Sequence, residues 1–67
     1  MGITDLNEIK ILYSPRRDDY EILIKEKYDG NFISYCPQLN KLIKGDSFAY
    51  VYSNMEEIIN KHIEGCL

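Results

Sequence analysis

The sequence predicts a small α+β domain of β-β-β-α order, in which one C-terminal amphipathic helix packs on one face of a three- to four-stranded, mainly antiparallel sheet. Apolar and polar residues alternate through most of the first two thirds of the chain, and from Ser47 the apolar spacing changes to three and four residues. With 67 residues, of which 45% are apolar, we expect a single domain over residues 1–67. A core this small favours an additional oligomer interface.

The first two predicted strands lie on either side of a proline-containing break. Residues 8–13 alternate in polarity, and Pro15 ends this run because proline cannot donate to a strand ladder. The second strand is expected at residues 20–28. Its alternation places Tyr20, Ile22 and Ile24 on one face and Glu21, Leu23, Lys25 and Lys27 on the other.

A hairpin is predicted next, because Asp29-Gly30 lies between two runs rich in β-forming residues. The third strand is expected at residues 32–36, and a short fourth strand at residues 41–44 is stopped by Gly45. In the third strand, a small residue at Ser34 would let the helix approach the sheet closely.

The helix is expected to begin near Ser47, whose side chain can cap its N-terminus, and to end near Gly65. An alternative remains open at residues 48–52, which also have high β-propensity and can form a hairpin with the fourth strand. Periodicity alone does not separate these two readings. The helical face would consist of Phe48, Val51, Tyr52, Met55, Ile58, Ile59 and His62.

Charge and composition narrow the possible partners. The net charge is −3, and the eight basic residues are interleaved with eleven acidic ones, which argues against direct DNA binding. The first residues show no signal-peptide pattern, and no run approaches the length of about 18 apolar residues that a membrane span needs. We therefore expect a cytoplasmic protein without a membrane partner.

Several short motifs follow one another at a fixed spacing within residues 20–63. A strand beginning at Tyr20 leads without a gap to Asp-Gly-Asn-Phe-Ile-Ser-Tyr-Cys-Pro at residues 29–37, then to Leu39 and to Gly-Asp-Ser at residues 45–47. In this order they resemble the N-terminal domain of HicB-type antitoxins, over about two thirds of the chain. The resemblance implies a partial RNase H-like fold and favours a helix from about Ser47.

The chain also departs from this family pattern. Asn40-Lys41 stands where the family has Pro-Gly, and neither the last strand of the family fold nor the DNA-binding domain of many antitoxins has a counterpart. The strand at residues 8–13 is a candidate replacement for that last strand. The resemblance implies a binding protein that neutralises a small basic toxin, a HicA-like mRNA interferase. The alternatives are a stand-alone or phage-encoded accessory or inhibitor protein on the same scaffold, and a weak RNA-binding module.

Catalytic and metal chemistry find little support in the sequence. His62 and Cys66 are four residues apart and Cys36 is the only other cysteine, so a fourth strong zinc ligand is lacking. Cys36 falls on the inward face of its strand, as expected for a small buried hydrophobe. No set of side chains forms a nucleophile–base pair or a carboxylate cluster. We expect no enzyme activity, no metal and no cofactor.

A protein interface is the remaining prediction. Leu23, Ile33 and Tyr35 should lie on the sheet face away from the helix, and Tyr50 on the helix flank is expected to extend this surface. Tyr20 and Tyr52 are expected in the core. The partner is either another protein or a second copy in a homodimer, and both kinds of contact are compatible with this surface.

Overall fold

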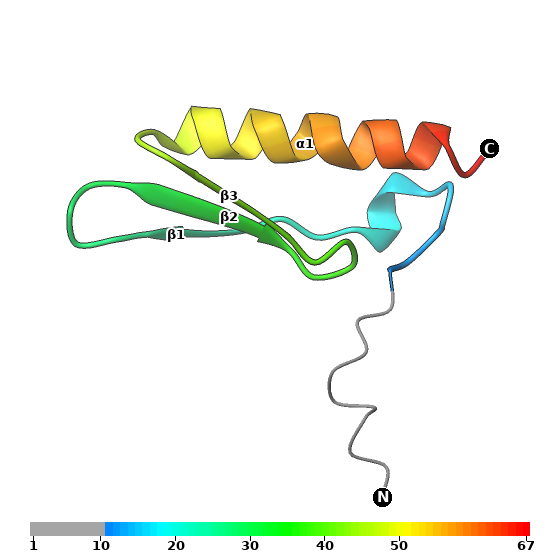
Figure 1. The fold of residues 1–67 in the computed structure, drawn as a ribbon, viewed down its shortest axis with the longest axis horizontal. Helices are drawn as coiled ribbons and strands as arrows, with labels where there is room; N and C mark the ends of the chain where they lie inside the picture. The colour runs from blue at the N-terminus through cyan, green and yellow to red at the C-terminus, as the bar shows by residue number, and fades with distance from the viewer. Residues whose placement is uncertain (1–10) are drawn as a thin grey trace, which may run out of the picture.

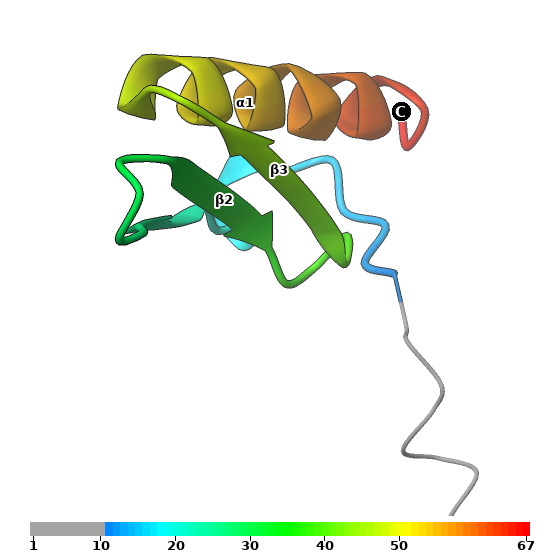
Figure 2. The same ribbon diagram turned by 60° about the vertical axis from the view of Figure 1, so that its left-hand side comes forward.

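The computed structural model describes residues 11–67 and has two layers, a three-stranded sheet and one long helix (Figure 1). The elements follow in the order η2 (Arg17–Asp19), β1 (Leu23–Glu26), β2 (Phe32–Cys36), β3 (Lys41–Gly45) and α1 (Phe48–Glu64). The sheet order is β1-β2-β3 and both pairings are antiparallel. Figure 2 shows that α1 lies along one face of the sheet. The predicted β-β-β-α arrangement is confirmed.

The β1–β2 hairpin turns one residue earlier than a two-residue Asp-Gly turn would. The N–H of Gly30 bonds to the carbonyl of Lys27 at 3.1 Å, and the N–H of Lys27 bonds to the carbonyl of Asn31 at 2.7 Å. Gly30 itself has φ 85°, a left-handed conformation that glycine adopts without a Cβ clash. The N–H of Asn31 also donates to the Asp29 carboxylate, which lowers the pKa of that group. β1 covers Leu23–Glu26 and is shorter at both ends than the predicted strand at residues 20–28; the turn accounts for the loss at its C-terminal end.

The helix at residues 48–64 decides between the two readings of residues 48–52. Ser47 Oγ accepts the N–H of Tyr50 at 3.1 Å and caps the first turn. Val51 is fully buried against the sheet, whereas Tyr52 remains 42% exposed. The buried residues of the helix, Val51, Met55 and Ile59, follow helical spacing, so the helical reading of residues 48–52 is the one observed. The helix ends at Gly65, whose N–H bonds to the carbonyls of Lys61 and His62.

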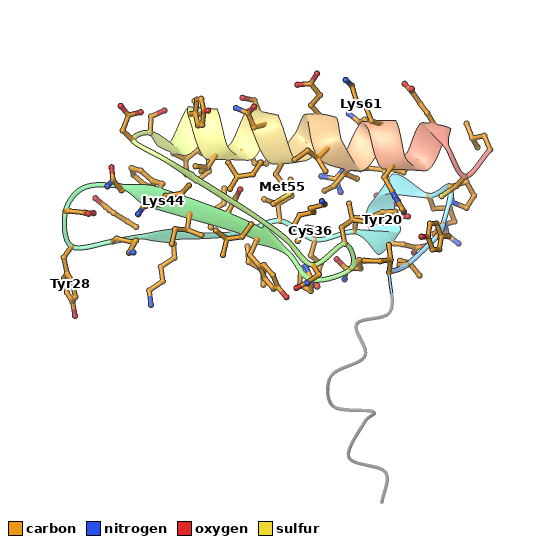
Figure 3. The ribbon with its side chains drawn as sticks, viewed as in Figure 1. Tyr20, Tyr28, Cys36, Lys44, Met55 and Lys61 are labelled. Atoms are coloured by element: carbon orange, nitrogen blue, oxygen red, sulfur yellow. The ribbon has the colours of Figure 1, made fainter. Side chains whose placement is uncertain are left out.

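The core lies between the layers, where the central strand meets the helix. Ser34 is completely buried there, and its hydroxyl donates to the carbonyl of Val51 at 2.8 Å. The expected close approach at Ser34 is thus confirmed, and a hydrogen bond accompanies it. Figure 3 shows Met55 directed from α1 toward the sheet, while Lys61 points away from it. The buried apolar residues are Tyr20, Cys36, Leu39, Val51, Met55 and Ile59.

Half of the predicted N-terminal strand, residues 8–10, lies outside the described residues. Its last three residues, 11–13, are not in a strand. Ile11 packs against the core, and the carbonyl of Leu12 accepts hydrogen bonds from His62 Nε2 at 2.7 Å and from the Tyr20 hydroxyl at 3.3 Å. Side chains rather than a neighbouring strand therefore occupy this carbonyl. Within residues 11–67 the sheet has three strands.

Candidate functional site

The outer face of the sheet, opposite α1, carries two rows of side chains that cross all three strands. The backbone register aligns Leu23 with Tyr35 and Tyr35 with Leu42, which forms an apolar row. One residue pair further along, Lys25 aligns with Ile33 and Ile33 with Lys44. Because strand residues alternate between faces, these six lie on the side away from Ser34 and the helix. We call this set the outer face: Leu23, Lys25, Ile33, Tyr35, Leu42 and Lys44.

The apolar row is substantially open to solvent. Leu23 is 52% exposed and Leu42 is 60% exposed, and no described element covers them. Tyr35 lies between them on the central strand and is half-buried. Its hydroxyl donates to Asn40 Oδ1 at 3.3 Å, in the loop where Asn40 has φ 51°. The ring is therefore held in place on the sheet without a covering layer.

Lysine is the only charged residue type on the outer face. Lys25 and Lys44 stand on either side of Ile33, and none of the six residues is acidic. The chain as a whole has a net charge of −3. The register thus brings two lysines to either side of Ile33, while the exposed Glu21, two residues before Leu23, continues the same side of the chain. The lysines favour partners with carboxylates near their contact surface.

Three of the four predicted interface residues come together, and the fourth does not. Leu23, Ile33 and Tyr35 share the outer face, as the alternation of the strands predicts. Tyr50 does not join them, because it lies on the helix side of the sheet. Its ring packs against Gly45 of β3, so closely that a Cβ added at this glycine would collide with it. Leu42 was not in the predicted set, although its alternation with Ile43 was a signal for the same face. Its position opposite Tyr35 depends on the β2–β3 register.

A second exposed apolar surface, the aromatic cluster, consists of Phe32, Phe48 and Tyr52. The Phe48 and Tyr52 rings stack with centroids 6.0 Å apart, and Phe32 meets Phe48 edge-on at 6.3 Å. Phe48 is 55% exposed and Tyr52 is 42% exposed. The expectation that Tyr52 belongs to the core is therefore wrong. It lies at the margin of the buried helical face, where its ring stacks on Phe48.

The flank of α1 nearest η2 is fixed by an ion pair. Arg17 Nη2 lies 2.7 Å from Glu56 Oε1, and Arg17 Nε donates to Glu56 Oε2 at 3.2 Å. This two-point hydrogen bond lowers the pKa of Glu56 and raises that of Arg17. Arg17 Nη1 also donates to the carbonyl of Tyr20 at 2.9 Å. The pair ties the segment before β1 to the middle of the helix.

The residues considered for metal or nucleophilic chemistry have structural partners. The His62 ring lies 5.0 Å from Tyr13 and 5.8 Å from Tyr20, and its Nε2 bonds to a backbone carbonyl. Cys36 is fully buried, and both it and Cys66 are free thiols. In the part of the chain that the structure describes, no three His, Cys, Asp or Glu side chains gather as metal ligands. Of the described residues, one continuous stretch, residues 25–28, lines a surface hollow at the end of β1.

Comparison with known proteins finds no match to a family model, to a curated protein or to a solved structure. Among residues 11–67, no helix combines the length and the apolar character required to cross a bilayer.

Proposed function

We propose that this chain is a small protein-binding module that acts through the outer face of its sheet, in the manner of an inhibitor or antitoxin. The observation that carries the proposal is the apolar row of Leu23, Tyr35 and Leu42, which spans the sheet and remains exposed. A rigid tyrosine between two aliphatic side chains is the type of surface that supplies binding energy at protein interfaces.

The lysines define the partner more closely. Lys25 and Lys44 border the apolar row, so a partner surface with an apolar centre and carboxylates at its rim would complement the outer face. The HicB-type hypothesis, in which a cytoplasmic module neutralises a small basic HicA-like toxin, then requires a locally acidic patch on that toxin. An accessory or inhibitor protein that binds an acidic surface fits the lysines without this requirement.

The test is co-expression and co-purification with a chosen partner. For the antitoxin form, the probe is a HicA-type toxin encoded beside this chain, and the readouts are rescue of growth and formation of a complex. We expect Leu42→Asp and Tyr35→Ala to abolish both while leaving the helical circular dichroism signal intact. Glu57→Ala, an exposed change on the helix, is the matched control. Full rescue by both outer-face variants would refute this placement of the binding surface.

An RNA-binding role is a different class of function and is separated by a simple measurement. Lys25, Lys44 and Tyr35 supply positive charge and one stacking ring, but two leucines occupy the positions beside that ring. Sheet surfaces that bind single-stranded RNA use several aromatic side chains. We expect no retention of a mixed-sequence RNA oligonucleotide in a gel shift at low salt. Salt-dependent retention would favour the RNA-binding role instead.

A further inference from the structure

β1 is an edge strand whose outward backbone groups have no partner among residues 11–67, since the sheet order is β1-β2-β3. On the β2 side, the N–H of Glu21 donates to Gln38 Oε1 at 2.9 Å and the N–H of Lys27 donates to the carbonyl of Asn31 at 2.7 Å. Backbone groups alternate in direction along a strand. Those of Ile22, Ile24 and Glu26 therefore point to the open edge, as a template for another strand.

The side chains next to this edge are also incompletely covered. Ile22 and Ile24 lie on the helix side of the sheet and are half-buried, because α1 packs mainly on β2 and β3. Tyr52 lies one turn before Glu56, on the flank of the helix that Arg17 ties to the segment before β1. The exposed Tyr52 ring thus lies on the flank of the helix that faces the β1 side of the sheet, where a further strand would add apolar surface.

We propose that a second copy of this chain pairs with β1 through its own β1, antiparallel, about a two-fold axis at Leu23. In this register Leu23 faces Leu23 of the second copy, Ile22 faces Ile24, and Glu21 faces Lys25. The edge-directed groups of Ile22 and Ile24 then exchange hydrogen bonds. Each contact occurs twice, so two apolar pairs and two opposite-charge pairs surround the central leucines.

Neighbouring registers that also keep the outer faces of the two copies on the same side pair their side chains less well. A two-fold axis at Lys25 would set two lysines against each other and Ile24 against Glu26. An axis at Ile24 would set Leu23 against Lys25 and Ile22 against Glu26. A register shifted by one residue would set outer-face side chains of one copy against helix-side side chains of the other. The charge and apolar pattern of residues 21–25 therefore selects the axis at Leu23.

The opposite edge of the sheet lacks this self-complementarity. β3 carries Lys41 and Lys44 and no acidic residue. Pairing about Ile43 would set Lys44 against Leu42 of the second copy, with no carboxylate opposite either lysine. Lysines on an edge strand are a recognised protection against strand addition. β1 is thus the edge at which a second copy fits.

This inference does not depend on the proposed function, because it rests on the backbone groups at the edge of β1, although Leu23 and Lys25 belong both to that edge and to the outer face. The two would nevertheless combine. Pairing at β1 would make a six-stranded sheet from two three-stranded ones and would join the two outer faces into a continuous surface. Leu42 lies on β3, away from the paired edge, so Leu42→Asp should abolish partner binding and leave the dimer intact. That variant distinguishes failure of one proposal from failure of the other.

The first test is a register-specific cross-link in the full chain. Cys66→Ser removes the accessible thiol, while Cys36 stays in place because it is buried. Leu23→Cys then places two thiols opposite each other in a non-hydrogen-bonded pair, with Cβ atoms about 4.5–5.5 Å apart before relaxation. Under mild oxidation we expect a covalent dimer. Lys25→Cys, on the same strand and face, is the matched control and should give none, because it faces Glu21. Equal cross-linking of the two variants, or none at Leu23→Cys, would overturn the register.

The second test reverses the charge of residues that face each other across the paired edge. The dissociation constant of the dimer is measured by sedimentation velocity at protein concentrations from about 1 μM to about 500 μM. Lys25→Glu sets like charges opposite each other twice, and we expect the dissociation constant to rise about tenfold. The double variant Glu21→Lys/Lys25→Glu restores opposite charges and should restore the dimer. A chain that stays monomeric at about 500 μM overturns the proposal, including the case in which residues 1–10 occupy the edge instead.

Discussion

Ser34 offers the sharpest test of how the helix sits on the sheet. It is completely buried on the central strand beneath α1, and its hydroxyl donates to the carbonyl of Val51 at 2.8 Å. Val51 is itself fully buried. Two properties of serine are used here, its small size and its hydroxyl group. Comparison of Ser34→Ala with Ser34→Val separates them.

The two variants should lower the free energy of unfolding by different amounts. Ser34→Ala removes one hydrogen bond, worth about 1 kcal/mol net, and leaves the Val51 carbonyl with its bond inside the helix. Ser34→Val loses the same bond and also forces extra carbon atoms into the contact between the layers, which costs a further 1–3 kcal/mol or so. The total, about 2–4 kcal/mol, is a large part of the roughly 3–10 kcal/mol expected for a chain of this length.

Urea unfolding followed by the helical circular dichroism signal measures both effects. We expect lower midpoints at an unchanged m-value, with Ser34→Val clearly below Ser34→Ala. In thermal scans each kcal/mol should lower Tm by about 4–8 °C. Ile33→Val, one residue away on the outer face, is the control and should cost about 1 kcal/mol or less. If Ser34→Val proves as stable as Ser34→Ala, close approach of the helix does not limit the residue at this position.

The remaining predictions concern the ion pair and two glycines. Glu56 has a lowered pKa in the folded state, so its contribution is present above the ordinary glutamate pKa and is lost as pH falls through the folded value. Glu56→Gln should therefore cost less than about 1 kcal/mol at pH 7 in urea titrations and nothing at pH 2; an equal cost at both would contradict the role of Arg17. Gly45→Ala should destabilise the chain because its Cβ meets the Tyr50 ring, and Tyr50→Ala should relieve this in the double variant; additive losses in a thermal-shift cycle would exclude the contact. Gly30→Ala should cost about 1 kcal/mol in urea unfolding from its φ of 85° alone, since the space around it is open; an unchanged midpoint would show that the turn relaxes.

Local pattern was sufficient for the elements that bury one face. The strand at Phe32–Cys36 has the predicted bounds, because Pro37 ends it and the Asp29-Gly30 turn precedes it. The cap at Ser47 and the spacing of Val51 and Met55 predict the helix that is observed. These features depend on neighbours within a few residues, so periodicity and turn chemistry capture them.

Residues 48–52 show where local pattern was insufficient. Their β-propensity and their helical spacing were both genuine signals, and the choice depends on what surface is available to Val51. The helical conformation is favoured because it buries Val51 against Ser34 and Gly45 of the paired strands β2 and β3. The error at Tyr52 has the same origin, because a residue at the margin of a helical face is buried only if the opposite layer reaches it.

The outer face likewise has a part that the sequence predicts and a part that only the paired sheet shows. Alternation along each strand determined from sequence that Leu23, Ile33 and Tyr35 point away from the helix. Only the pairing of the three strands placed Leu42 in the apolar row and brought Lys25 and Lys44 to either side of Ile33. These residues are far apart along the chain, and their neighbourhood follows from strand order and register, which a single sequence does not specify. The pair of lysines beside Ile33 is thus a property of the tertiary structure, because it arises from which residues the sheet sets side by side.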